Sequence, residues 1–249
     1  MAYFFAREYR GPAFELFGSA HLAALLVILT LNLLLALFRS SNEKIKTSIG
    51  WILAIFLWLD EIAWHIWNVA VGTWSIQFML PLNVCSVLIW LSAIMLIFKN
   101  YRIYEFAYFL GIGAGFQYLL TPDLGIYGFP HFRFFQTMLA HGLLFTSAIY
   151  LTVVEGLRPT WRSLLRVAAG ANIYMALVGI INWATGSNYL FIAHKPATAS
   201  LLDLLPAWPW YILWMEIIGL GMALILYLPF AIKDRHGKAG ADRELNPQG

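Results

Sequence analysis

Few side chains in this sequence could do chemistry, and its single cysteine is the strongest nucleophile among them. Cys85 lies in the segment LPLNVCSVLIW. A thiol becomes reactive when a neighbouring base or cation stabilises its thiolate, and His141 and His65 are both candidates for that neighbour. A lone cysteine in an apolar segment is more often a small buried hydrophobic residue. The pairing therefore depends on where the surrounding elements bring these residues.

A second group of polar residues could bind a substrate or support such a reaction. Glu61, His65 and Asn68 are spaced by four and then three residues, so they share one face of a helix. Side-chain amides could donate hydrogen bonds to an oxyanion, whereas Arg133 and His131 could hold an anionic phosphate headgroup. The supporting residues that we predict are His21, Glu61, His65, Asn68, Asn83, Gln117, His131, Arg133, Gln136, Asn182 and Glu216.

A metal site is an alternative use of some of these residues. Imidazole and carboxylate groups are suitable zinc ligands, and His21, Glu61, His65 and His141 carry them. The sequence contains no His-Glu-x-x-His or His-x-x-x-His pair, and one cysteine excludes both an internal disulfide and a multi-cysteine metal site. The leading interpretation therefore includes no metal and no cofactor.

The composition indicates that these residues lie in a membrane protein. Of the 249 residues, 61% are hydrophobic and 12% are charged, whereas soluble domains carry about 25% charged residues. Seven apolar segments approach the roughly 20 residues that a helix needs to cross a bilayer. We predict an all-α membrane protein with one seven-transmembrane-helix bundle in residues 1–232, its helices at 19–38, 48–71, 80–98, 104–120, 134–154, 164–185 and 207–232, and a disordered tail at 233–249.

The distribution of basic residues predicts the orientation of this bundle. Of the sixteen Lys and Arg residues, only Arg7, Arg10, Arg133 and Lys195 fall on one side of the predicted membrane. Because basic loops stay in the cytoplasm, we predict an outside amino terminus and a cytoplasmic carboxyl terminus. The charge pattern follows topology rather than a nucleic-acid footprint. The expected partners are membrane lipids and not nucleic acid, and the expected location is the cell membrane, as a multi-pass protein.

With this orientation, the polar residues of all seven segments fall in the outer half of the membrane. An ionisable side chain in hydrocarbon costs several kcal/mol unless it faces a cavity or a partner. We therefore predict a shared pocket that opens outward, with inner halves that are almost purely apolar. The segment between helices four and five, LTPDLGIYGFPHFRFF, contains glycines and prolines that allow a compact lid over this pocket. The spacing Gly111-x-x-x-Gly115 predicts a helix-packing face.

Several motifs resemble those of the YwaF family of bacterial integral membrane proteins. They are FGSAHL, DEIAWHIWN, LPLNVCSVLIW and LTPDLGIYGFPHFRFFQTMLAHG, and the resemblance covers about residues 17–230. That family is distantly similar to a eukaryotic multipass acyltransferase that remodels ether phospholipids through a cysteine acyl-enzyme and a histidine. The resemblance implies that Cys85 is the nucleophile and His141 the base. Members of the YwaF family often have histidine at the position of Asn83, and the eukaryotic enzyme has histidine at the position of Ser86. Because this chain lacks both histidines beside the cysteine, His141 is the favoured base.

The leading prediction is an intramembrane lipid acyltransferase or acyl hydrolase with a Cys85–His141 site in the outer half of the bilayer. One alternative is a metal-dependent membrane lipid hydrolase that uses the histidine and glutamate ligands named above. The other alternative is a non-enzymatic receptor or carrier for a small ligand. A channel is not favoured, because no polar stripe continues to the cytoplasmic side.

Overall fold

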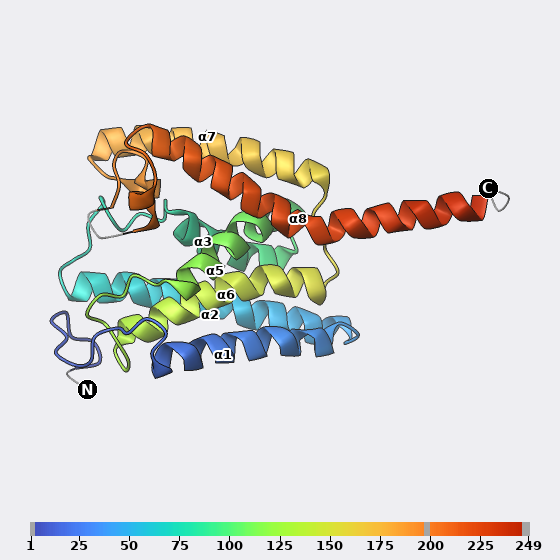
Figure 1. The fold of residues 1–249 in the computed structure, drawn as a ribbon. Helices are drawn as coiled ribbons and strands as arrows, with labels where there is room; N and C mark the ends of the chain where they lie inside the picture. Colours follow the sequence, from blue (N-terminus) through green and yellow to red (C-terminus); the bar gives the residue numbers. More distant parts are fainter. Residues whose placement is uncertain (1–2, 197–199, 246–249) are drawn as a thin grey trace.

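The computed structural model describes residues 3–196 and 200–245, and this part of the chain is helical without any strand (Figure 1). Shorter helical segments lie at Leu35–Phe38, Ala107–Gly111, Tyr189–Phe191 and Leu201–Leu204. In chain order the α-helices are α1 (Ser19–Leu34), α2 (Glu43–Ala70), α3 (Val84–Phe98), α4 (Tyr101–Phe106), α5 (Ile112–Leu120), α6 (Phe132–Val153), α7 (Trp161–Thr185) and α8 (Trp210–Leu245).

Five helical stretches in the described part of the chain are long and apolar enough to cross a membrane. They are Ser19–Phe38, α2, α6, α7 and Trp210–Asp234. This confirms the predicted all-helical membrane protein in its general form. Helix α3 has 15 residues, and the segment from Tyr101 to Leu120 changes helix type along its length. The count of seven spans therefore stays a prediction.

The observed helix boundaries differ from the predicted ones at three places. Helix α2 begins at Glu43, five residues before the predicted start, because the Asn42 side chain accepts a hydrogen bond from the Ile45 amide at 3.0 Å. Between α4 and α5, Ala107–Gly111 forms a π-helical segment, a local widening that sequence periodicity does not reveal. Helix α8 continues to Leu245, whereas the sequence favours a disordered tail from residue 233.

Helix α6 occupies the centre of the bundle. It packs against α1, α2, α3 and α5, whereas α7 and α8 pack on each other and reach the rest through α4, α5 and the π-helical segment. In Figure 1, α7 and α8 form one side, α1, α2 and α6 form the other, and α3 and α5 lie between them. Fully enclosed side chains from α2, α3 and α6 fill the core, including those of Leu57, Met95, Leu144 and Leu151.

The predicted small-residue face brings α5 against α6. A Cβ atom on Gly115 would lie 3.4 Å from the His141 carbonyl oxygen and 3.7 Å from Phe145. A Cβ atom on Gly111 would lie 3.4 Å from the Leu144 side chain. The absence of side chains at these glycines therefore lets the two backbones approach closely and sets the position of α5 beside His141.

The amino-terminal segment, residues 3–18, covers one end of the bundle together with the α5–α6 loop, residues 121–131 (Figure 1). The Phe132 amide donates to the Phe4 carbonyl at 2.8 Å, and the Phe14 amide donates to the Gly125 carbonyl at 3.2 Å. Gly128 lies directly against the backbone of Pro12 and leaves no room for a Cβ atom. We call this end of the molecule the covered end.

The opposite end contains buried charges, so the expectation of almost purely apolar inner halves is wrong. Glu105 on α4 is fully buried and pairs with Arg166 on α7, and it accepts a hydrogen bond from the Ser163 hydroxyl at 2.6 Å. Nearby, Glu155 receives Lys99 at 2.8 Å and the Tyr150 hydroxyl at 2.7 Å. These pairs tie α4 to α7 and the end of α3 to the end of α6, which explains why the charges are tolerated there.

The close approach of α5 and α6 predicts a specific sensitivity at Gly115. Gly115→Leu should lower the melting temperature of the detergent-solubilised protein, because forcing a side chain into packed contacts costs about 1–3 kcal/mol. Gly219→Leu on α8 is the matched control, since a Cβ atom there meets nothing within 4 Å. Equal melting temperatures for the two variants in a thermal-shift assay would contradict the packing described here.

Candidate functional site

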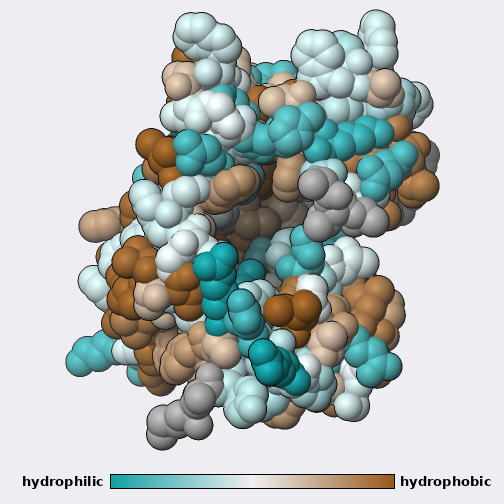
Figure 2. Space-filling model, turned by 90° about the vertical axis from the view of Figure 1, so that its left-hand side faces the viewer, coloured by the Kyte–Doolittle hydropathy of each residue, from teal (hydrophilic) through white to brown (hydrophobic). Residues whose placement is uncertain are grey.

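The molecule is hollowed at its covered end. Figure 2 views this end directly and shows a recess between the α7–α8 side and the α1–α2–α6 side, with hydrophilic groups around it and more apolar surface inside. Helix α3 begins at this end, and α5 runs toward it between the two sides (Figure 1). The first turn of α3 and the last turn of α5 therefore carry residues toward the recess.

Cys85 lies in the first turn of α3 and is half-buried. It packs on the apolar core, and its helix packs against α2, α5 and α6. Its thiol makes no hydrogen bond with the described residues. The predicted nucleophile is thus enclosed by protein on several sides yet still partly accessible.

The imidazole of His141 on α6 is held in one orientation and one tautomer. Its Nδ1 lies 2.9 Å from the Thr137 carbonyl oxygen, which can only accept, so Nδ1 carries the proton of the neutral ring. The ring stacks on Tyr118 with a centroid distance of 3.9 Å and an angle of 5° between the planes. This arrangement leaves Nε2 as an acceptor, and it has no hydrogen-bond partner in the described part of the chain.

The predicted partners Cys85 and His141 therefore belong to one region without a direct hydrogen bond between them in this structure. Tyr118 links the two elements, because it stacks on the imidazole and its helix α5 also packs on α3, whose first turn carries Cys85. Tyr118 was not among the predicted residues. Its only signal was its place three residues after Gly115 on the same helix face.

Two carboxylates enter the same region from α2. Asp60 and Glu61 are 7% and 4% exposed, so both adjacent residues are buried, although sequence spacing favours Glu61 alone. The Gln136 side chain donates to Asp60 Oδ2 at 2.9 Å and accepts from Arg133. Both ends of the Gln136 amide are thereby engaged, while the second N–H of its NH₂ group has no partner among the described residues.

Arg133 is directed into the bundle rather than toward lipid headgroups. Its guanidinium lies over the Trp64 ring at 3.7 Å from the centroid, a cation–π contact, while it donates to Gln136. It is also close enough to Asp60 and Glu61 for their charges to interact. Arg133 therefore partly compensates two buried carboxylates, and α2 and α6 are joined by this network.

His65 lies beside Glu61, one helical turn further along α2. Its Nε2 is 3.6 Å from Glu61 Oε1, and its Nδ1 accepts a hydrogen bond from Trp74 Nε1 at 3.1 Å. Because the indole N–H can only donate, the neutral imidazole carries its proton on Nε2, facing the glutamate. The predicted helix face of Glu61 and His65 is thus observed.

His21 and His131 contact the backbone through both ring nitrogens, and their predicted supporting role stays a prediction. His21 is 1% exposed, its Nδ1 accepts from the Phe17 amide at 3.1 Å, and its Nε2 lies 2.8 Å from the Leu119 carbonyl. His131 is fully buried and caps α6 by accepting from the Arg133 amide at 3.1 Å. Backbone groups thus occupy both nitrogens of each imidazole in this structure.

His131 also fastens the amino-terminal segment. Its Nε2 lies 3.0 Å from the Ala6 carbonyl oxygen, and its ring stacks on Tyr127. Two further bonds reinforce the tether: Trp67 donates to the Phe5 carbonyl and Tyr127 donates to the Arg7 carbonyl, at 2.9 and 2.8 Å. The predicted lid therefore has a second component that sequence analysis did not anticipate.

The remaining predicted side-chain amides differ in whether they already make hydrogen bonds within the protein. Asn68 and Asn182 are buried and use their side chains to close turns after α2 and α7. Asn83 accepts from the Leu190 amide at 3.0 Å, which leaves its NH₂ group without a partner among the described residues. Gln117 is exposed, and Glu216 is half-buried on α8.

The alternative ligand set is not assembled into a metal site. Within residues 3–196 and 200–234, no three His, Cys, Asp or Glu side chains come together as metal ligands. Both nitrogens of His21 already meet backbone groups, and Nδ1 of His141 meets the Thr137 carbonyl. His21, Glu61, His65 and His141 therefore do not converge on one ion.

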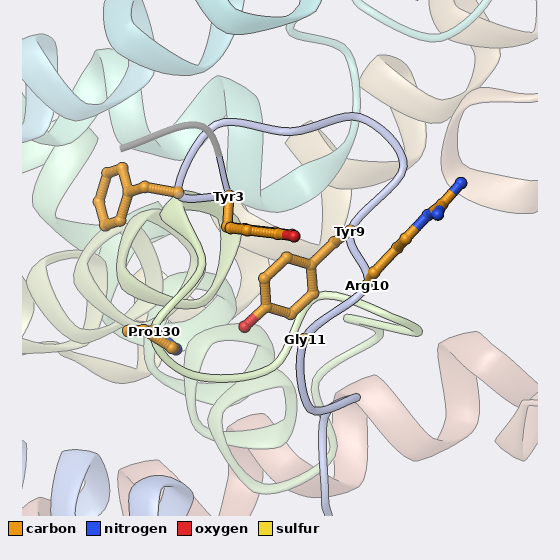
Figure 3. Close-up of a pocket in the computed structure, with 6 residues that line it drawn as sticks. Tyr3, Tyr9, Arg10, Gly11 and Pro130 are labelled. Atoms are coloured by element: carbon orange, nitrogen blue, oxygen red, sulfur yellow. The ribbon is translucent and has the colours of Figure 1, made fainter.

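A shallow cleft of about 470 Å³ lies on the amino-terminal segment itself (Figure 3). Its lining consists of Tyr3, Phe4, Tyr9, Arg10, Gly11 and Pro130. In Figure 3 the Tyr3 and Tyr9 side chains lie next to each other, while Arg10 points away from them. This cleft contains none of the predicted nucleophile or base residues.

Removing Arg133 should destabilise the protein through the buried carboxylates. Arg133→Met leaves Asp60 and Glu61 without their positive neighbour and the Gln136 side-chain oxygen without its donor, and leaving a buried polar group unsatisfied costs about 1–3 kcal/mol. Adding Asp60→Asn should recover part of this loss. Thermal unfolding of the single and double variants measures both effects, with the exposed Arg162→Met as control. A neutral Arg133→Met would contradict the proposed compensation.

The tether at His131 should loosen in acid. Burial holds the pKa of His131 below its ordinary value of 6.5, against the raising effect of the Ala6 bond, and the Arg133 charge lowers the pKa further. The tethered state therefore favours the neutral ring, so its stability is complete above pH 6.5 and falls as the pH drops below that value. Protonation of Nδ1 also removes the acceptor that caps α6.

Hydrogen exchange of residues 3–9, corrected for intrinsic rates, measures this loosening between about pH 7.5 and 5.5. His131→Gln should exchange faster at the higher pH and lose most of the pH dependence. The exposed His194→Gln is the control. Identical pH dependence in the His131 variant and the unmodified protein would be incompatible with this role.

Comparison with known proteins gives one match. A family model described as the TMEM164 family matches residues 16–227, which include all of the residues of the site described above. No curated protein matches this sequence. No solved structure matches it either.

Proposed function

This chain belongs to the TMEM164 family of transmembrane proteins, and we propose that it is a lipid acyltransferase or acyl hydrolase with Cys85 as nucleophile and His141 as base. The observation that carries the proposal is the state of His141. Its Nδ1–H is bound to the Thr137 carbonyl and its ring is fixed by Tyr118, so Nε2 is presented as a neutral acceptor in the region of the only thiol. A general base needs this tautomer and this fixed orientation.

The start of α3 supplies a second feature that suits acyl transfer. The first amides of a helix have no intrahelical acceptors, and the positive end of the helix favours an anion. The Asn83 side chain does not cap them, because its oxygen accepts from the Leu190 amide instead. The amides of Cys85 and Ser86, with the Asn83 NH₂ group, are therefore our candidates for an oxyanion hole.

The proposed reaction begins with an ester bond of a membrane lipid. His141 Nε2 takes the proton of the Cys85 thiol as the sulfur attacks the ester carbonyl carbon. The carbon–oxygen bond breaks, the leaving alkoxide takes the proton from His141, and the acyl group remains as a thioester on Cys85. The two side chains must approach for this step, as catalytic contacts often do when substrate fills a site.

The proposal includes an orientation in the membrane. We propose that α3 and the segment from Tyr101 to Leu120 complete seven spans, that the covered end faces away from the cytoplasm, and that the protein lies in the cell membrane. The basic residues Lys44, Lys46, Lys99 and Arg102 belong to loops and helix ends opposite the covered end, which supports this orientation. The motifs resemble those of the YwaF family, and the distant similarity of that family to a cysteine-dependent acyltransferase supports the same chemistry.

A covalent acyl-enzyme tests this proposal directly. Protein reconstituted in phospholipid vesicles should gain the mass of an acyl chain, and neutral hydroxylamine should remove it. Since the chain contains one cysteine, a thioester can form only at Cys85. Cys85→Ala should show no adduct and no lipid turnover, and His141→Gln should reduce acylation by about 10²–10⁴-fold, the usual contribution of a general base.

His194→Gln serves as the matched histidine control and should acylate normally. Full turnover by Cys85→Ala would refute the proposal. Saturable lipid binding without any adduct or turnover would instead indicate a receptor or carrier.

A further inference from the structure

Glu61 is a buried carboxylate near the Arg133 charge, but it takes no part in the hydrogen bonds that join α2 to α6. It is 4% exposed, and neither of its oxygens makes a hydrogen bond with the described residues. The neutral His65 ring faces it, with Nε2 at 3.6 Å from Glu61 Oε1. By contrast, Asp60 accepts from Gln136, and Glu105 is paired with Arg166. Buried polar groups are normally satisfied, so an unpaired carboxylate in a membrane protein requires a functional explanation.

The surroundings of Glu61 keep its carboxylate directed and accessible. Trp74 donates to His65 Nδ1, which places the proton of the neutral imidazole on the Nε2 that faces Glu61. The Glu61 oxygens are not among the fully enclosed polar atoms without a partner, so they border open space. Helix α2, which carries Glu61, packs directly on α3, whose first turn carries Cys85. The carboxylate therefore borders open space on a helix that lies against the one with the thiol.

An acyl transfer through a thioester needs proton transfer at two different oxygen atoms. The first belongs to the leaving alkoxide, which His141 on α6 serves in the reaction described above. The second belongs to the acceptor hydroxyl, which must lose its proton as it attacks the thioester. Glu61 enters from α2, a different helix, which packs directly on α3 with Cys85 in its first turn, and it offers an unengaged oxygen. It is thus placed to serve the second oxygen.

We propose that Glu61 is the general base of the second half-reaction, in which a hydroxyl compound, either water or a lipid alcohol, accepts the acyl group. This inference rests on the proposed acyl transfer at Cys85. The Glu61 carboxylate takes the proton of the acceptor hydroxyl while the oxygen attacks the thioester carbonyl carbon. The carbon–sulfur bond breaks, and the departing Cys85 thiolate takes the proton from Glu61. Thiol and carboxylate are both restored, and the product is an ester or a free acid.

The variant Glu61→Gln separates the two half-reactions. It keeps the size of the side chain and removes the basic oxygen. We expect the acyl-enzyme to form as fast and to the same extent as in the unmodified protein, then to persist, with turnover reduced about 10²–10⁴-fold. The unchanged burst of acylation shows at once that the variant is folded. Hydroxylamine, a strong nucleophile that needs no base, should release the trapped acyl group from it normally.

The outcomes distinguish this inference from the proposed function. Glu8→Gln, on the exposed amino-terminal segment, is the matched control and should turn over normally. Normal turnover by Glu61→Gln, or loss of acylation and turnover to the same degree, overturns the role of Glu61 while leaving the thioester on Cys85 intact in the unmodified protein. Absence of a thioester in every variant, with Cys85→Ala still active, overturns the proposed function and this inference together.

Discussion

The joining of α2 and α6 through buried charges is the constraint on which the rest of this structure depends. Asp60, Gln136, Arg133 and Trp64 form a continuous chain of contacts between the two helices. The chain is 61% hydrophobic, and water does not solvate charged side chains inside a membrane bundle. Each buried charged group therefore needs a protein partner or a cavity. The network fixes the relative position of the helices that carry Glu61 and His141, and α6 in turn positions α5.

Three histidines show how the same side chain takes different roles in this bundle. The imidazoles of His21 and His131 meet backbone groups through both nitrogens, so they act as fixed connectors between segments. His141 uses only Nδ1, and the close approach at Gly115 brings Tyr118 against the ring. What separates a connector from a candidate base is therefore the number of ring nitrogens that the backbone occupies.

The general architecture could be predicted from the sequence, because it depends on the composition and on the lengths of the apolar segments. The helical membrane character, the small-residue face at Gly115 and the shared helix face of Glu61 and His65 follow from periodicity. The roles of His131 and Arg133 were missed, because depth along a helix does not reveal which partner a polar group finds. Glu105 was missed for the same reason, since Arg166 is distant in sequence. Asp60 was not among the predicted residues, because its partner Gln136 lies on another helix and is distant in sequence.

The tether of the amino-terminal segment has a consequence for how the chain matures. The carbonyls of Phe4, Phe5 and Ala6 bind groups contributed by Trp67, His131 and Phe132. The amino-terminal segment must therefore wait until residue 132 has been synthesised before it can make all of these contacts. Until the start of α6 has been synthesised and inserted, this end of the nascent protein stays uncovered. A bulky affinity tag placed before this segment would lie beside these contacts, so a carboxyl-terminal tag is the better choice for purification.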